Sequence, residues 1–412
     1  MLNKRLLLIP SGIGLSHLIR LLLIARRLLG HVSEVGVAFS DERVLETNDH
    51  FKFFLVPEVK VTDFSSNVFA EYTQTFVEQC VEEELKAIKA FQPDAIVGDF
   101  RPSAAISARV AGVPYISVVN AYMTDYFDPV DVMIPKEKSA ARHAIASIAG
   151  KAIQAVQKRA LASPFRAAAK KFGLKDLVSL YDFLKGDLTL IADLPQFCPL
   201  ENLPSSYRYI GPLIWEGNSV PAPRYLENRD PSRPLIYATT GNTGEEKLVD
   251  LVVESFKEKP CDVVITTGEY IHPRNITGFP NIHIEKFIPG SMVLKHATVA
   301  IHCGGNGTTY QVISHGVPAV VLPFNNDQKI NAWLIKRNGL GLPLSTEITG
   351  NQLRLAAKTV IEDSKIREKL SEFQKLLANV DGAESATNEI SSFLEHRGSG
   401  SSQATPVQGG FV

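Results

Sequence analysis

The chain has 412 residues, of which 45% are hydrophobic and 8% aromatic, and its formal net charge at pH 7 is −1. This length exceeds what one hydrophobic core usually supports, so two domains of roughly 200 residues are expected. The near-neutral charge argues against a general nucleic-acid or membrane binder, and four scattered cysteines without a C-x-x-C pair indicate a reducing compartment and offer no zinc site.

Residues 1–29 combine a basic start with a leucine-rich run, as a signal peptide would. Pro10 and the glycines Gly12 and Gly14 interrupt that run, so a strand, a loop and a helix are expected instead. The sequence contains no uninterrupted apolar stretch of about 18 residues, which argues against a membrane-spanning helix. We expect a cytoplasmic protein, with peripheral contact at the inner membrane face as an open alternative.

The first half alternates short apolar runs with helical stretches, which is typical of a parallel sheet built from βαβ units. The strands are predicted at residues 5–9, 35–39, 51–56, 95–98, 115–119 and 188–192. The helices are predicted at residues 18–29, 69–91 and 101–111.

The loop from Ser11 to His17 joins the first strand to the first helix. It has a GxG pattern, with His17 where a dinucleotide-binding fingerprint has its third glycine and Asp41 at the end of the next strand, which allows a nicotinamide or flavin enzyme. Alternatively His17 is a general base, because imidazole titrates near neutral pH and can take a proton from a hydroxyl. A plain helix-capping role is the third interpretation.

Asp99 ends an apolar strand in the sequence PDAIVGDF. At the carboxyl end of a parallel strand, a carboxylate lies in the crevice where such folds bind ligands, and it can orient an imidazole and stabilise its protonated form. Capping of the following helix is an equally ordinary use of Asp at this junction. Taken alone, the residue types leave both roles open.

Two further stretches of the first half have a distinctive composition. Residues 120–127 (NAYMTDYF) supply aromatic side chains that either line an apolar cleft or pack in the core. Residues 139–175 hold eight Lys and Arg residues and no acid on an alanine-rich helical stretch. A solvated helix face is the ordinary explanation of such a stretch, and contact with anionic lipid or an acidic acceptor is the alternative.

A proline-rich stretch at 215–233 is predicted to be a linker, after which the alternation begins again. The later strands are predicted at residues 235–239, 263–266, 282–287, 299–301 and 319–322. The later helices are predicted at residues 245–257, 307–315, 329–338, 350–362, 364–378 and 383–396. We expect domains at 1–214 and 234–396, followed by a disordered, Gly/Ser-rich tail at 397–412.

The segment 298–332 carries the most information about function. A strand runs into the sequence HCGGNGT, which starts at His302, and a helix follows. Glycines at such a junction allow a ligand to approach the backbone, and the helix start offers unpaired N–H groups and a positive dipole end, which favours an anion such as phosphate. Asp327 and Gln328, after the next strand, suit a hydroxyl-rich ligand. Phosphate and sugar together indicate a nucleotide-sugar.

This segment resembles the signature of the UDP-glycosyltransferase superfamily, which includes plant secondary-product and bacterial macrolide glycosyltransferases. The matching positions stand in the family's order: His302, Gly304, Asn306, Thr308, Gly316, Pro318, Asp327, Gln328, Asn331 and Ala332. The resemblance implies the GT-B fold, an α/β arrangement of two Rossmann-like, doubly wound domains that face each other across a cleft, with final helices that cross back to the first domain. It also implies that His17 is the general base and that Asp99 is its partner.

The resemblance assigns the remaining donor-binding residues as well. Phe287 falls where an aromatic ring stacks on the nucleotide base, and Thr240-Gly241-Asn242 matches a turn that approaches the phosphates. The residues expected to bind the donor are Thr240, Asn242, Phe287, His302, Gly304, Gly305, Asn306, Gly307, Thr308, Asp327 and Gln328.

Two positions depart from the family's pattern. Gly290 replaces the usual glutamine near the ribose, and Tyr310 stands where many plant members carry a ribose-binding Glu. UDP and dTDP therefore both remain open as the nucleotide. No D-x-D motif stands near these loops, so backbone amides and a helix dipole are expected to stabilise the departing diphosphate, without a metal or another cofactor.

We therefore predict an inverting glycosyltransferase that moves a sugar from a UDP- or dTDP-sugar to a hydroxyl of a small-molecule or lipid-like acceptor. Nucleic acid is not expected as a partner. The alternatives are a nucleotide-sugar epimerase of the same architecture, a non-catalytic relative that only binds nucleotide, and the nicotinamide-dependent oxidoreductase that the first glycine loop allows.

Overall fold

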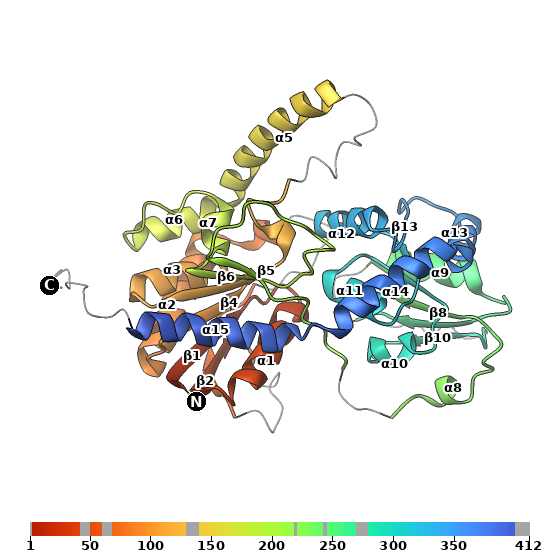
Figure 1. The fold of residues 1–412 in the computed structure, drawn as a ribbon, viewed down its shortest axis with the longest axis horizontal. Helices are drawn as coiled ribbons and strands as arrows, with labels where there is room; N and C mark the ends of the chain where they lie inside the picture. The colour runs from red at the N-terminus through yellow and green to blue at the C-terminus, as the bar shows by residue number, and fades with distance from the viewer. Residues whose placement is uncertain are drawn as a thin grey trace, which may run out of the picture.

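The computed structural model describes residues 2–41, 50–59, 68–128, 140–217, 221–241, 245–268 and 279–399. Two β-sheets, one of seven and one of six strands, lie in separate halves of the molecule, and helices pack around each (Figure 1). Every strand pair in both sheets is parallel. The predicted α/β architecture with two parallel sheets is thereby confirmed.

The first sheet has the strand order β3-β2-β1-β4-β5-β6-β7. Its strands are β1 (Leu2–Pro10), β2 (Val32–Phe39), β3 (Lys52–Leu55), β4 (Ala95–Asp99), β5 (Tyr115–Val119), β6 (Leu188–Ile191) and β7 (Tyr207–Tyr209). Its helices are α1 (Leu15–Leu28), η2 (Val68–Glu71), α2 (Gln74–Phe91), α3 (Pro102–Ala111), η3 (Ala121–Met123), α5 (Ala140–Leu161), α6 (Ser163–Lys171) and α7 (Leu180–Leu184).

The apolar run in β1 explains why helices cover this sheet on both faces. Leu6 and Leu8 belong to a core cluster shared with α1, whereas Leu7 and Ile9 belong to a second cluster shared with α2 and α3. Successive side chains of a strand point to opposite faces, so an uninterrupted apolar strand needs cover on both sides.

The second sheet has the strand order β10-β9-β8-β11-β12-β13. Its strands are β8 (Leu235–Thr239), β9 (Asp262–Thr266), β10 (Ile282–Glu285), β11 (Val299–His302), β12 (Ala319–Val321) and β13 (Gly341–Pro343). Its helices are α9 (Glu246–Phe256), α10 (Gly290–Leu294), α11 (Asn306–Ser314), α12 (Asn326–Arg337), α13 (Gly350–Glu362) and α14 (Ser364–Ala378).

Both sheets reverse their strand order at one internal point, between β1 and β4 in the first sheet and between β8 and β11 in the second. In doubly wound sheets the crevice at such a switch point, beyond the carboxyl ends of the strands, is where ligands bind. Asp99 and His302 end β4 and β11, and the segments that follow β1 and β8 carry His17 and Thr240. The topology therefore gathers most of the predicted chemistry at two switch points.

The final helix, α15 (Gly382–Ser399), lies along the first domain (Figure 1, blue). Its Ala386, Ile390 and Leu394 join the core cluster formed by α1 and the first sheet. The predicted tail at 397–412 therefore begins too early, because residues 397–399 still belong to α15. The remaining part of the tail, 400–412, lies outside the described residues.

Other elements also differ from the prediction. The three-residue edge strands β7 and β13 are not predicted, because runs this short have no readable period. The helix expected from residue 69 begins at Gln74, where the Thr73 hydroxyl caps it by accepting a hydrogen bond from the Phe76 N–H at 3.2 Å. The stretch 215–233 contains a short helix, α8 (Arg224–Glu227), where none is expected.

Candidate functional site

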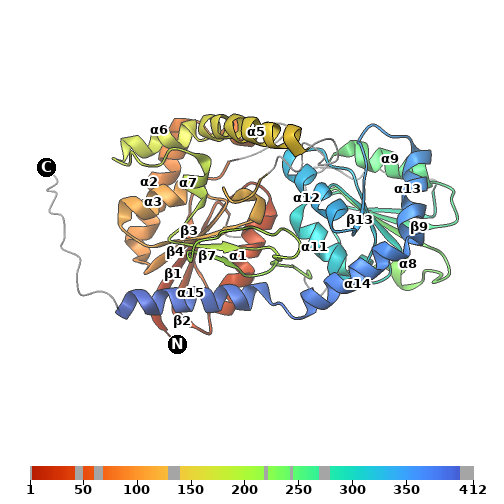
Figure 2. The same cartoon turned by 45° about the horizontal axis from the view of Figure 1, so that its top comes forward.

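A cavity of about 1180 Å³ lies between the two sheets, on the side of their switch points. Its walls come from both domains: His17 and Phe100 line it from the first, and Thr240, His302 and Asp327 line it from the second. Figure 2 shows the two halves that enclose it. A cavity between two domains at their switch points is the usual place for a ligand in such folds.

His17 lies in the first turn of α1 and is mostly buried. Gly14, with φ 79°, turns the chain into this helix, a conformation that glycine adopts without strain. The His17 Nδ1 lies 2.7 Å from the Asp99 Oδ1. Because a carboxylate accepts the Nδ1 proton, the other ring nitrogen is the one left to act toward the cavity.

Asp99 is fully buried between two cationic or potentially cationic groups. One oxygen faces His17, and the other lies 2.9 Å from the Nε of Arg20, an ion pair without hydrogen-bond alignment. The prediction paired Asp99 with His17 and did not include Arg20. Since Arg20 lies one turn after His17 on α1, an (i, i+3) spacing could have placed both on one face.

A chain of polar contacts continues from Arg20 into the second domain. Arg20 donates to Asn120 Oδ1 at 2.7 Å, and the Asn120 amide nitrogen lies 3.4 Å from Asp193 Oδ2. Asp193, which follows β6, also accepts from Asn306 and from the Tyr310 hydroxyl, each at 3.0 Å. Burial raises the pKa of Asp193. The two domains are thus linked by a buried carboxylate that the sequence analysis missed, although Asp193 follows an apolar strand as Asp99 does.

The second domain faces the cavity with the loop between β11 and α11. The His302 Nδ1 accepts a hydrogen bond from the Gly304 N–H at 3.1 Å, so its proton is on Nε2. That Nε2 is buried and has no hydrogen-bond partner among the described residues. Burial lowers the pKa of His302 to about 4, so the ring is neutral at pH 7 and offers one unused N–H donor.

The glycines of this loop leave room for a ligand at the start of α11. Gly304 has φ 94°, and a Cβ there would lie 2.9 Å from the Gln328 carbonyl oxygen, so only glycine fits. At Gly305 and Gly307 a Cβ would meet no described atom within 4 Å. No side chain caps α11, whose N-cap is Gly305. Its first N–H groups are therefore available to an anion.

Asn306 and Thr240 line the cavity, but their polar side-chain atoms are partly engaged. The Asn306 amide nitrogen donates to Asp193, which leaves its oxygen and its backbone N–H for a ligand. The Thr240 hydroxyl donates to the Thr267 carbonyl at 2.9 Å. Thr308 lines the cavity as expected, whereas Asn242 lies outside the described residues.

Phe287 lines the cavity with 58% of its surface exposed. Its ring stacks on Trp215, with centroids 5.7 Å apart and planes 30° apart. The prediction placed Trp215 in the linker and gave it no role at the site. Tyr310 occupies a different place, because its hydroxyl contacts Asp193 in the interior, whereas the neighbouring Gln311 lines the cavity.

Asp327 and Gln328 lie in the first turn of α12. The helix is capped by Asn325, which accepts from the Gln328 N–H at 3.0 Å, so Asp327 is not the cap. The Gln328 Oε1 accepts from the N–H groups of Phe324 and Asn325, which leaves only its amide nitrogen for a ligand. Asp327 lines the cavity, where burial raises the pKa of its carboxyl and the charge of His17 offsets only part of this rise.

The first-domain wall of the cavity is largely apolar and aromatic. Its described apolar and aromatic members include Phe69, Tyr72, Phe100, Tyr122, Met123, Leu161, Leu180, Tyr181 and Leu184. Of the stretch 120–127, Asn120, Tyr122 and Met123 line the cavity, whereas Tyr126 packs edge-on against Tyr207. The expected aromatic lining is therefore present, but most of it comes from other segments.

The basic stretch 139–175 forms α5 and α6, and α5 projects from the first domain (Figure 1). Lys158 lies 3.7 Å from the Tyr181 ring centroid and lines the cavity, and burial lowers its pKa to about 8. Lys171 pairs with Glu78 at 2.8 Å. In the part of the chain that the structure covers, no helix is long and apolar enough to cross a bilayer.

Comparison with known proteins agrees with this geometry. The family described as Erythromycin biosynthesis protein CIII-like, C-terminal domain, matches residues 251–396. A PGL/p-HBAD biosynthesis glycosyltransferase of Mycobacterium tuberculosis (strain ATCC 25177 / H37Ra) is 29% identical over 380 residues, which cover 89% of this chain and 87% of the relative.

Two solved structures share the fold. The glycosyltransferase of kitacinnamycin superposes with a TM-score of 0.74 at 19% identity, covering 96% of this chain and 99% of the other. The glycosyltransferase VinC in complex with dTDP superposes with a TM-score of 0.68, also at 19% identity, covering 95% and 100%. Signature, architecture and relatives together support the UDP-glycosyltransferase superfamily, and the chain is a sugar-transferring enzyme with the GT-B fold.

Proposed function

We propose that the chain is an inverting glycosyltransferase that moves a sugar from a UDP- or dTDP-sugar to a hydroxyl of a small-molecule or lipid-like acceptor. One observation carries the proposal. A single cavity has an imidazole backed by a buried carboxylate on one wall, and an uncapped helix start beside a neutral imidazole N–H donor on the other. The first wall suits proton removal, and the second suits a diphosphate.

The proposed reaction is one displacement. The free ring nitrogen of His17 takes the proton of the acceptor hydroxyl while that oxygen attacks the anomeric carbon of the sugar. The bond from this carbon to the diphosphate oxygen breaks, and the nucleoside diphosphate leaves with the electron pair. A single attack from the face opposite the leaving group inverts the anomeric configuration. Asp99 stabilises the imidazolium that forms.

The leaving diphosphate is stabilised in this scheme by the chain's own donors. These are the N–H groups at the start of α11 and the Nε2–H of His302, which needs an acceptor to replace its lost water. We propose that no divalent metal ion is required. Transfer measured with and without EDTA tests this point, and a rate that falls with EDTA and returns with Mg²⁺ or Mn²⁺ contradicts it.

The nucleotide and the sugar bind different parts of the second-domain wall in this proposal. Phe287, exposed in the cavity, offers a ring face to the base, and Asp327 faces the region between the nucleotide loop and His17. The relative bound to dTDP keeps that nucleotide open beside UDP.

The apolar wall of the first domain supports an acceptor with a hydrophobic or aromatic body. A lipid-like acceptor would also bring the exposed Ile153 and Val156 of α5, and the basic residues of 139–175, near a membrane surface. Co-sedimentation with anionic liposomes at low and high salt tests that contact. If the same amount of protein stays in the supernatant with and without liposomes, these residues do not bind the membrane surface.

The reaction is tested in three steps. Thermal shift with UDP-, dTDP- and GDP-sugars identifies the donor, and mass spectrometry of products identifies an accepted hydroxyl compound. NMR of the product then gives the anomeric configuration relative to the donor, and retention of configuration overturns the single-displacement scheme. Incubation of the donor without acceptor separates the epimerase alternative, because an epimerase converts the donor alone.

A further inference from the structure

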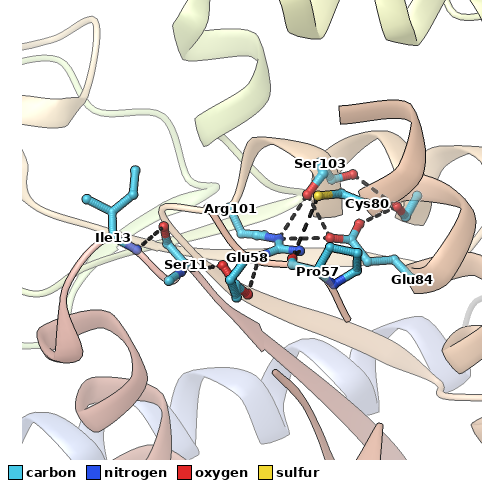
Figure 3. Close-up of polar contacts among 10 residues, drawn as sticks. Ser11, Ile13, Pro57, Glu58, Cys80, Glu84, Arg101 and Ser103 are labelled. Atoms are coloured by element: carbon cyan, nitrogen blue, oxygen red, sulfur yellow. Dashed lines mark hydrogen bonds and ion pairs between the residues drawn. The ribbon is translucent and has the colours of Figure 1, made fainter. Parts of the chain in front are cut away.

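Three charged side chains are buried beside the loop before α1 (Figure 3), and none of them lines the cavity. They are Glu58, Glu84 and Arg101, called here the Arg101 cluster. Arg101 is 2% exposed and Glu84 is fully buried. The Arg101 Nε donates to Glu84 Oε1 at 2.8 Å, its Nη1 donates to Glu58 Oε1, and its Nη2 donates to the Pro57 carbonyl at 2.8 Å.

A buried ion pair usually stabilises a core less than apolar side chains of similar volume would, because the desolvation of the charges offsets much of their attraction. Here two carboxylates share one guanidinium, and burial raises the pKa of Glu58 to about 7. Such a costly arrangement indicates a role beyond filling space. The other contacts of Glu58 and Glu84 indicate which of the two carboxylates has that role.

Glu58 connects the cluster to the loop before α1. Its Oε2 accepts the Gly12 N–H at 2.6 Å. A Cβ on Gly12 would lie 2.4 Å from this oxygen, so the contact requires glycine. In the same loop the Ser11 N–H donates to the Asp99 carbonyl at 2.9 Å, and the Ser11 hydroxyl accepts from the Ile13 N–H at 3.2 Å. Figure 3 shows Glu58 between Arg101 and the chain at Ser11.

Arg101 connects the cluster to the turn between β4 and α3, where three consecutive residues meet the base. Asp99 holds the His17 Nδ1, and the Phe100 ring stacks on the His17 ring with centroids 5.3 Å apart and planes 13° apart. Phe100 has φ 49°, a left-handed conformation that is strained for a bulky side chain and needs support from its surroundings. Arg101, the next residue, is fixed by its buried partners.

We propose that Glu58 is a positioning residue that ties the Ser11–Gly14 loop to the Asp99–Arg101 turn and thereby holds the His17 ring in place against Asp99 and Phe100. This inference rests on the proposed role of His17 as base. Glu58 touches neither the cavity nor the base, so it acts only through Gly12 and Arg101. Without it, the loop and the turn lose the one side chain among the described residues that bonds to both.

Glu84 provides a matched control. It binds the same guanidinium and is at least as deeply buried, but its other contacts are Ser103 and Ser107 of α3, not the loop. Removing either charge should lower stability. Only removal of the Glu58 charge should disturb His17.

The experiment compares Glu58→Gln with Glu84→Gln by two readouts. Protein labelled with ¹⁵N-histidine gives the Nδ1–H signal of His17, assigned by its absence in His17→Gln. Steady-state transfer with the acceptor found above gives kcat and KM. We expect Glu58→Gln to shift or broaden the signal and to lower kcat about tenfold at unchanged UDP affinity, whereas Glu84→Gln keeps the signal and kcat within twofold.

A second variant covers the case in which Glu58→Gln does not fold. Gly12→Ala keeps every charge of the Arg101 cluster but pushes the Glu58 carboxylate away from the loop, so the same loss of signal and of kcat is expected. An unchanged signal and kcat in Gly12→Ala, or equal losses in the Glu58 and Glu84 variants, overturns the inference. The NMR readout needs no substrate, so a failure of His17 as base would leave the signal test of Glu58 intact.

Discussion

His17 and His302 face one cavity from opposite domains. Each lies at or just after the carboxyl end of a strand beside the point where the strand order of its sheet reverses. Their surroundings are nevertheless opposite. His17 has a carboxylate on Nδ1, whereas His302 has only a backbone N–H on Nδ1 and is almost fully buried. A carboxylate favours an imidazolium, and burial without a charged partner favours the neutral ring. In the proposed reaction, one side-chain type therefore serves as a base on one wall and as a neutral donor on the other.

The largest effect is expected at the first histidine. His17→Ala removes the base, so kcat should fall about 10³- to 10⁴-fold while the affinity for UDP, bound by the other domain, stays unchanged. Transfer assays and calorimetry measure the two quantities. Residual transfer within tenfold of the unsubstituted enzyme would mean that the two histidines do not differ in the proposed way.

Asp99→Asn tests whether the carboxylate makes the difference. The variant keeps the shape but removes the charge that stabilises the imidazolium, so kcat should fall about 10²- to 10³-fold. UDP affinity should again be unchanged, and Asp94→Asn, at the other end of β4, is the control because its carboxylate pairs with Lys4 outside the cavity. Equal losses in both variants would point to general destabilisation.

His302 should reveal its neutral state through stability. Its pKa is about 4 in the folded chain and about 6.5 in the unfolded chain, so the unfolded state binds more protons between these values. The stabilising contribution is complete above pH 6.5 and is lost as the pH falls toward 4, by up to about 3 kcal/mol. Urea unfolding between pH 7 and 4.5 should be less pH-dependent in His302→Gln. Parallel curves for the two proteins would contradict the assignment of a neutral, buried ring.

The same substitution series tests the donor role of the unused N–H. His302→Ala should weaken UDP binding about tenfold, because one hydrogen bond to a charged oxygen is lost. The loss should be similar at pH 6 and at pH 8, since the ring is neutral at both. A loss that grows toward low pH would indicate a charged imidazole at this wall.

Asp327 gives the smallest effect. Asp327→Ala should lower the affinity for a UDP-sugar about threefold more than the affinity for UDP, because one hydrogen bond to a sugar hydroxyl disappears. Lys336→Ala, at an exposed position of the same helix outside the cavity, is the control. Equal changes for UDP and UDP-sugar in Asp327→Ala would place this carboxylate outside the sugar site.

The order of the long strands and helices was predictable because their apolar patterns are clear, with an unbroken apolar run in β1 and a helical period in α13. The loop at His302 and the pairing of His17 with Asp99 could be anticipated from motif and resemblance. The structure brings His17 and this loop to one cavity, with Asp99 buried behind His17. Their chemical roles stay predictions.

Other features depend on contacts between distant segments and leave no local pattern. Asp193 contacts Asn306 and Tyr310, which lie more than 100 residues away in the sequence. The sequence around Tyr310 therefore does not indicate that its hydroxyl contacts the other domain. The Gln328 oxygen is engaged by its own helix start, a competition that the capping spacing from Asn325 could have revealed. The stacking of Trp215 on Phe287 likewise joins a supposed linker to the site.

Because α15 returns to the first sheet, the core of this domain is built from both ends of the polypeptide. A fragment that ends at residue 214 would expose to solvent the apolar surface that Ala386, Ile390 and Leu394 cover in the full chain. The segment that leaves the first domain also packs closely against the segment that returns to it, since a Cβ on Gly382 would lie 2.4 Å from the Pro212 carbonyl oxygen. The chain therefore passes between the two halves twice at the same place.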